Sequence, residues 1–130
     1  MNRTVIKFNV LILLCFSLLA CTAVIDDAKG LDERLAEYGY RPGQNVDQIQ
    51  SHQIADWTYL DSRHLMFSNG VAEHYLISLQ RPCTALRGSE VLLFKTRTNS
   101  LSKFDELVVP EGGVAKHCSI ESMSRLIRAE

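Results

Sequence analysis

From Trp57 onward, apolar residues recur at every second position, and β-branched and aromatic residues dominate the chain. This alternation is typical of strands with one face on a core and the other toward solvent. It predicts strands over residues 56–60, 63–67, 71–79, 90–97, 103–109 and 114–118. Turns are predicted at Asp61-Ser62, Asn69-Gly70, Thr98-Asn99-Ser100 and Glu111-Gly112-Gly113. Because no helix separates these strands, we expect an antiparallel sheet or a small barrel.

Amphipathic segments flank the predicted strands. Residues 31–38 place apolar side chains on one helical face and charged side chains on the other. Ser119 is a typical N-cap residue, and residues 120–128 after it carry an apolar stripe at helical spacing. That stripe consists of Met123, Leu126 and Ile127. We therefore expect an α+β fold, mainly β, with a short N-terminal helix and a C-terminal helix. Residues 40–44 are predicted to form a turn, and residues 46–54 a further helical turn.

The register around Asn69-Gly70 depends on the length of the loop. With a three-residue loop over residues 68–70, the apolar residues of both neighbouring strands share one face. That face comprises Leu65, Phe67, Val71, Tyr75, Ile77 and Leu79, and only Glu73 interrupts it. A two-residue loop mixes the faces, so the longer loop is favoured, with Gly70 in the left-handed conformation. This register places His64 directly opposite His74.

The N-terminus has the pattern of a secretory signal. Residues 1–7 hold Arg3 and Lys7 without an acid, and residues 8–20 are almost continuously apolar. A basic start followed by an apolar core of this length is typical of a signal peptide. The core is short for a bilayer that is about 30 Å thick. We therefore expect residues 1–20 to be removed.

The predicted signal ends in the tetrapeptide LLAC at residues 18–21, which looks like a bacterial lipobox. In such a motif Cys21 is acylated and becomes the first mature residue, and several acyl chains hold a protein almost permanently to a membrane. By resemblance to the lipoprotein sorting rule, Thr22 favours the outer membrane because it is not Asp. The sequence thus predicts a lipidated tether over residues 21–30 and a single periplasmic β-rich domain over residues 31–130.

Two cysteines remain once Cys15 leaves with the signal and Cys21 carries lipid. In an oxidising periplasm, Cys83 and Cys118 are expected to form a structural disulfide. A redox or metal-binding pair is the alternative, although the chain has no Cys-x-x-Cys motif. His117 beside Cys118 suggests a thiolate activated by histidine, a role that the disulfide would exclude.

Several short motifs lie within residues 57–120. They are Trp57, the strand Tyr75-Leu76-Ile77-Ser78-Leu79, Pro82-Cys83, Leu86, Asp105 and Cys118-Ser119-Ile120. In these motifs the chain resembles a family of Gram-negative lipoproteins, the domain-of-unknown-function family numbered 6491. The resemblance implies the disulfide and a periplasmic setting, and it implies no catalytic or ligand-binding residue.

Few side chains combine into a candidate site. His64 and His74, with Met66 on the same face, would be near enough to share a transition metal, unless they are ordinary solvated histidines. Trp57 is expected to pack in the core or at its rim, with lining of a ligand groove as the alternative. No cofactor is expected. No nucleophile–base or acid–base set can be assembled from the sequence, so an enzyme is disfavoured.

A net charge of −1 lacks the strongly basic footprint of a nucleic-acid binder. We therefore expect a non-enzymatic outer-membrane lipoprotein that faces the periplasm and binds an envelope component or helps to assemble one. Its partners would be the membrane, through the lipid at Cys21, and another envelope protein. The alternative is a small-ligand or metal-binding lipoprotein that uses the face of His64 and His74 or a groove near Trp57.

Overall fold

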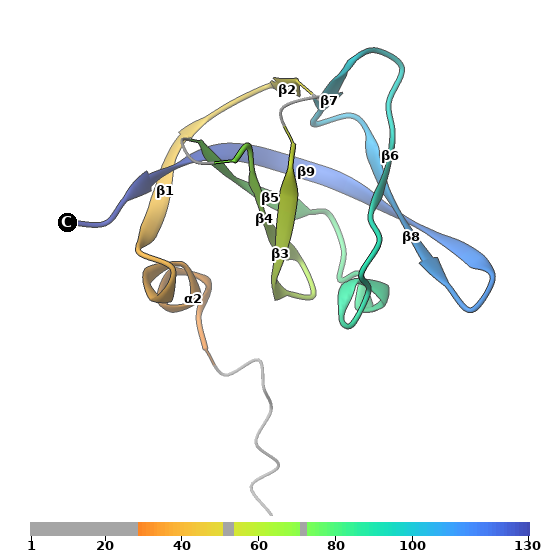
Figure 1. Cartoon of the computed structure of the whole chain (residues 1–130), viewed down its shortest axis with the longest axis horizontal. Coiled ribbons are helices and arrows are strands. Elements are labelled where there is room, and N and C mark those ends of the chain that lie inside the picture. Colours follow the sequence, from red (N-terminus) through yellow and green to blue (C-terminus); the bar gives the residue numbers. More distant parts are fainter. Residues whose placement is uncertain (1–28, 51–53, 71–72) are drawn as a thin grey trace, which may run out of the picture.

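The computed structural model describes residues 29–50, 54–70 and 73–130, so the predicted signal peptide and Cys21 lie outside the described residues. Two helical segments are described: α2 (Leu31–Glu37) and the short 3₁₀ segment η4 (Thr84–Leu86). The strands are β1 (Tyr40–Asn45), β2 (Gln48–Gln50), β3 (Asp56–Asp61), β4 (His64–Ser68), β5 (His74–Leu79), β6 (Leu93–Lys95), β7 (Ser100–Ser102), β8 (Glu106–Glu111) and β9 (Val114–Arg128). Figure 1 shows how these elements are arranged.

Most of the strands form one antiparallel sheet that curves into a half-barrel. The strand order is β3-β4-β5-β9-β8-β6, and β1 also pairs with β9. The long strand β9 crosses the whole molecule, with β8 on its first part, β5 on its middle and β1 on its end. The short strands β2 and β7 pair only with each other among the described residues.

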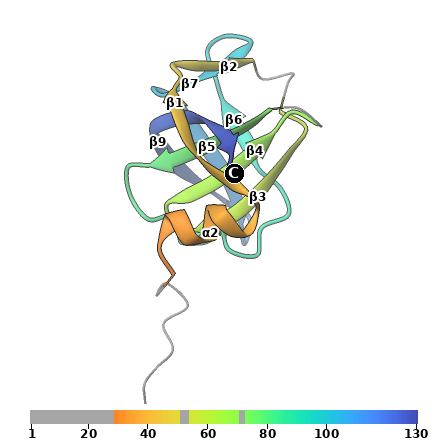
Figure 2. The ribbon, with the colours of Figure 1, turned by 90° about the vertical axis from the view of Figure 1, so that its left-hand side faces the viewer.

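The two faces of the sheet carry separate apolar cores. The larger core fills the concave side, where Phe67 of β4 makes an edge-to-face contact with Phe94 of β6 at 5.5 Å between ring centroids. Ile49 of β2 and Leu101 of β7 are buried in the same core, so this strand pair covers part of the concave side. The smaller core lies between the other face and α2. Its buried members are Leu35, Leu60, Met66, Leu76 and Leu126. Figure 2 shows α2 beside β1 and β3.

Several sequence predictions are confirmed. The predicted N-terminal helix is α2, and all six predicted strand regions contain strand. The apolar face proposed for β4 and β5 also lies in the larger core, because Leu65, Phe67 and Tyr75 are all buried there. Gly70 has a φ of 79°, the predicted left-handed conformation.

The predicted C-terminal helix is wrong, because residues 120–128 continue β9. Ile120 and Met123 both point into the larger core although they are three residues apart. A β-bulge at Glu121 allows this: Ser78 pairs with Ser122, whereas Leu79 pairs with Ile120. Leu126 then lies in the smaller core on the other face. A bulge and two buried faces thus produce a spacing that imitates a helical stripe.

Three short strands were missed. β1 replaces the turn predicted over residues 40–44, β2 lies in the predicted helical turn, and β7 begins in the predicted turn at Ser100. β1 holds a Pro and a Gly, which disfavour strand prediction, yet it pairs along the end of β9. A Cβ atom at Gly43 would lie 2.7 Å from the carbonyl oxygen of Arg125, so this position needs glycine for the close approach.

The predicted register of β4 and β5 is also wrong, by four residues. Phe67 pairs with Tyr75 instead of Val71, because the connection runs from Asn69 to Glu73. The side chain of Asn69 closes this loop: its Oδ1 accepts a hydrogen bond from the Glu73 backbone N–H at 3.1 Å. A shift by an even number of residues leaves every side chain on its predicted face, so the core prediction survives the error.

Candidate functional site

The two histidines proposed as a metal pair lie far apart. His64 is opposite Ser78, and His74 is opposite Ser68, at the other end of the same strand pair. Four residues along a strand correspond to about 13 Å. The two imidazoles therefore do not face each other as predicted. Within the described ranges, no group of three or more His, Cys, Asp or Glu side chains is placed to hold a metal ion.

Each of these histidines has its own local partner. The Nδ1 atom of His64 lies 2.8 Å from Oδ1 of Asp61, at the turn between β3 and β4. The ring of His74 packs on Tyr40 of β1, with 4.5 Å between the ring centroids. Both contacts join neighbouring elements, so the two histidines help to position the strands around them.

Trp57 lies near the edge of the sheet. It is on β3 opposite Phe67 and packs, half-buried, against the larger core. This placement agrees with the interpretation of Trp57 as a rim residue. Trp57 lines neither of the hollows described below.

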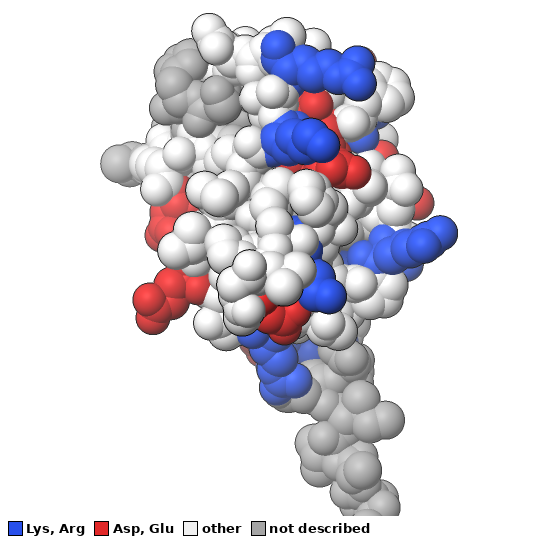
Figure 3. All heavy atoms as spheres, turned by 90° about the vertical axis from the view of Figure 1, so that its right-hand side faces the viewer, with Lys and Arg blue, Asp and Glu red and all other residues white. Residues whose placement is uncertain are grey.

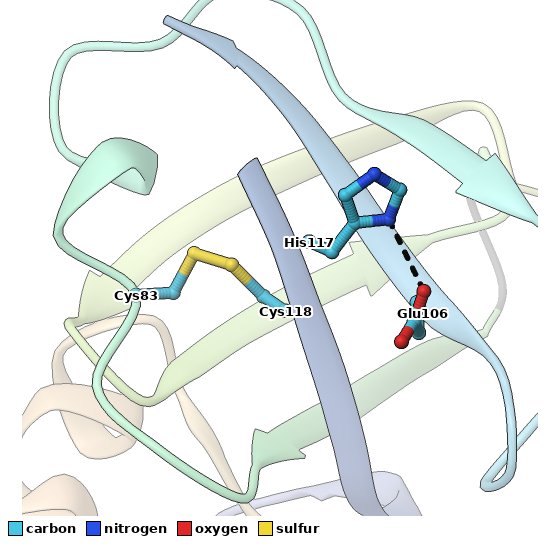
Figure 4. The surroundings of a disulfide bond; sticks show 4 residues. All are labelled: Cys83, Glu106, His117 and Cys118. Carbon is cyan, nitrogen blue, oxygen red and sulfur yellow. Dashed lines mark hydrogen bonds and ion pairs between the residues drawn. A yellow bond between two sulfur atoms is a disulfide. The ribbon is translucent and has the colours of Figure 1, made fainter. Parts of the chain in front are cut away.

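The predicted disulfide is confirmed. Cys83 and Cys118 are bonded, with 6.1 Å between their Cα atoms and 35 residues between them in sequence. The bond ties the segment between β5 and η4 to β9, at a place where β5 no longer pairs with that strand. Figure 4 shows the disulfide on one side of β9 and His117 turned away from it toward Glu106.

The convex side of β6, β8 and β9 forms a surface that we call the outer face. Directly opposed residues point to the same side of a sheet, and two cross-strand rows result. One row is Leu93–Val108–His117, and the other is Lys95–Glu106–Ser119. None of these six side chains is buried, whereas their sequence neighbours Leu107 and Val109 are fully buried on the concave side.

A small charge network lies on the outer face. The carboxylate of Glu106 accepts a hydrogen bond from Nδ1 of His117 at 3.1 Å, and Nζ of Lys95 lies 4.0 Å from the same oxygen. Exposed pairs of this kind contribute little to stability, typically less than about 1 kcal/mol. Here they orient the imidazole of His117 and give the Glu106 carboxylate two nearby partners.

A hollow of about 400 Å³ adjoins the outer face beside the disulfide. Its lining residues are Gln80, Arg81, Pro82, His117, Cys118 and Ser119. We call it the Arg81 hollow. A second hollow of about 230 Å³ shares Pro82, His117 and Cys118 with it and is also lined by Lys116. Within the described part of the chain, neither Arg81 nor Lys116 has an ion-pair partner.

The outer face was not predicted from the sequence, although the glycine turn at residues 112–113 indicates part of it. Gly112 and Gly113 have φ values of 57° and 81°, which makes a two-residue turn with Glu111 opposite Val114. Counting back from that turn would have placed Glu106, Val108 and His117 on one face. Arg81 could not be found in this way, because the disulfide brings its segment to β9.

The fold and this surface define a class: a disulfide-tied antiparallel half-barrel with one packed helix and an open sheet face. The chain belongs to the family of unknown function DUF6491, whose model matches residues 4–130. The match extends well beyond the stretch that carried the resemblance in the sequence. No curated protein and no solved structure matches the chain.

In the described ranges, the helices are all too short or too polar to cross a bilayer.

Proposed function

We propose that the protein is a non-enzymatic cell-envelope lipoprotein whose β-domain docks another envelope protein through the outer face. Lipid on Cys21 would hold the domain on the periplasmic side of the outer membrane. The observation that carries the docking role is the presence of exposed apolar side chains on and beside β6, β8 and β9, with Leu93 on the outer face. The anchoring role is supported by the sequence pattern that ends at Cys21.

The exposed apolar side chains gather unevenly. Leu93 is 52% exposed and Phe104 is 85% exposed, and Val91 and Val114 are also more than half exposed. Leu93 lies on the outer face, Val91 and Phe104 lie in the segments just before β6 and β8, and Val114 begins β9 opposite Glu111, on the other side of the sheet. Figure 3 shows the end of the molecule at the β8–β9 hairpin, with charged side chains of both signs around an uncharged centre. Exposed apolar side chains next to charged ones are typical of a protein-binding surface.

The position of α2 agrees with a docking role for the β8–β9 end of the domain, which lies opposite that helix. The described residues begin just before α2, and the β8–β9 hairpin points away from that helix (Figure 1). A ten-residue tether over residues 21–30 spans at most about 35 Å. A domain held at its α2 end would present the β8–β9 end to the periplasm, where a partner can reach it.

One capture experiment tests both parts of this proposal. The lipoprotein is purified from crosslinked envelopes as the parent, as Cys21→Ser, as Leu93→Asp and as the matched control Tyr38→Asp, which changes an exposed apolar residue near α2. We expect Cys21→Ser to leave the membrane fraction, Leu93→Asp to lose the captured protein, and Tyr38→Asp to retain it. Membrane retention of Cys21→Ser would contradict the anchor. Equal capture by both Asp variants would contradict the docking face. Retention of metal without any protein partner would favour a metal-binding role instead.

A further inference from the structure

We propose that the Arg81 hollow binds a carboxylate group that the docked protein carries on an extended segment. This inference rests on the proposed function, because it names the chemistry of the partner at the edge of the outer face. Three features support it: an unpaired guanidinium, a free strand edge and a neighbouring apolar row.

Arg81 lines the hollow, is exposed, and has no ion-pair partner in the described ranges. A guanidinium presents its N–H donors in a planar fork that fits a carboxylate with two parallel hydrogen bonds. The neighbouring His117 already contacts Glu106, whereas Arg81 has no such partner.

The edge of β9 at this hollow has free hydrogen-bonding groups. In the two-residue hairpin, Glu111 and Val114 form the first hydrogen-bonded pair, so every second residue from Val114 bonds to β8. His117 and Ser119 therefore direct their backbone groups to the other edge. The Ser119 carbonyl accepts a hydrogen bond from the Gln80 N–H at 3.0 Å, as this alternation requires.

The backbone N–H of His117 has no acceptor outside the β8–β9 ladder among the described residues. It points to the edge where the hollow lies, between β9 and the segment of Arg81. A backbone N–H, a guanidinium and the hydroxyl of Ser119 are the donor types that bind oxyanions in proteins. The hollow thus combines one unpaired positive charge with neutral donors.

The charge balance favours a singly charged anion. Glu106 lies one strand away, opposite Ser119, and its carboxylate would repel a dianion more strongly than a carboxylate. The apolar side chains of Leu93 and Val108 continue from His117 across the outer face. A segment with an acidic residue next to apolar residues would fill the hollow and cover this row together.

The test uses the mature lipoprotein in detergent and a labelled peptide, acetyl-Leu-Asp-Leu-amide, with its Asn counterpart as the uncharged probe. Binding is followed by fluorescence anisotropy and by the amide NMR shifts of His117 and Ser119. We expect the Asp peptide to bind and to shift both amides. Arg81→Gln should weaken its binding at least about tenfold, as is usual for loss of a charge-assisted pair.

Lys116→Gln is the matched control, because it removes a neighbouring unpaired cation whose side chain points to the other face of β9. It should weaken binding less than about twofold at physiological salt. Equal binding of the Asp and Asn peptides, or equal losses in both variants, would overturn the carboxylate site. Tight binding of acetate or phosphate without the peptide would make it a small-anion site and also overturn the inference.

Failure of the inference and failure of the proposed function are distinguishable. If Arg81→Gln leaves peptide binding unchanged but Leu93→Asp still abolishes capture from envelopes, the docking face stands and the carboxylate site does not. If the peptide binds through Arg81 but Leu93→Asp retains the captured protein, the anion site stands and the docking function does not.

Discussion

At the scale of single residues, several polar side chains of the domain have local partners that fix the strands. His64 is held by Asp61, and His74 packs on Tyr40. Tyr75 donates a hydrogen bond from its hydroxyl to Oε2 of Glu73 at 2.9 Å. These contacts explain why histidines that looked like a metal pair in the sequence have structural roles. Arg81 differs from them because its charge is left without an ion pair in the described structure.

Tyr75 leads to a prediction about alkaline pH. Burial raises the pKa of the Tyr75 phenol above its ordinary value of 10.0, and the hydrogen bond to Glu73 raises it further. Because the pKa of Tyr75 is higher in the folded than in the unfolded chain, the protonated phenol contributes to the free energy of unfolding. This contribution is complete at a pH below the pKa of the unfolded chain. This contribution is lost as the pH rises through the folded value. The free energy of unfolding should therefore decrease from about pH 9 to about pH 11.

Urea unfolding at both pH values, with phenolate absorbance recorded alongside, measures this effect. In Tyr75→Phe the alkaline loss of stability should be smaller, and the phenolate absorbance should lose one titrating group. Tyr38→Phe, which changes a half-exposed phenol, should behave like the parent. An identical pH dependence in Tyr75→Phe and the parent would show that Tyr75 is not the responsible group.

At the scale of elements, the sequence predicted strands well where alternation was regular and failed where a local irregularity changed the spacing. Leu65 and Phe67 alternate along β4, as do Tyr75 and Ile77 along β5, and their common face was predicted correctly. β9 was not predicted as one strand, because the bulge at Glu121 changes the periodicity. Such a bulge depends on the partner strand β5, so the sequence of β9 alone does not distinguish it from the apolar stripe of a helix.

The pairing of β1 with β9 gives a prediction at this scale. Gly43→Ala places a methyl group 2.7 Å from the carbonyl oxygen of Arg125, so one of the two backbones must move. We expect a loss of about 1–3 kcal/mol in the free energy of unfolding, the range typical of overpacking. Arg41→Ala on the same strand changes an exposed side chain and should stay within about 0.5 kcal/mol of the parent.

Urea denaturation of both variants provides the measurement. A Gly43→Ala protein as stable as Arg41→Ala would mean that β1 does not approach β9 as closely as the structure shows.

The disulfide also acts between elements, since it joins the segment before η4 to β9. Closing a loop of this length stabilises a fold by about 3–4 kcal/mol in the chain-entropy model. That is a large part of a total stability of about 5–15 kcal/mol. The Cys83→Ala/Cys118→Ala double variant should therefore unfold at much lower urea, and the reduced parent should match it. Two freely alkylated thiols in the unreduced, denatured parent would contradict the bond itself.

At the scale of the whole molecule, β9 joins two regions that lie at opposite ends. Its end pairs with β1 beside α2, and its beginning forms the open hairpin with β8. The sequence supported a β-rich domain with one disulfide, and both are confirmed. The candidate site could be predicted only in part. The glycine turn fixes the row of Val108 and His117, but only the tertiary fold brings Arg81 beside it.

The most direct test of the docking role is site-specific photo-crosslinking in living cells. A photoreactive amino acid replaces Leu93 or Val108 on the outer face, or Arg41 or Arg128 at the β1 end as controls. We predict that both outer-face positions crosslink to the same envelope protein and that the control positions do not. Equal crosslinking from the β1 end, or adducts only with a second copy of this chain, would contradict docking of another protein through the outer face.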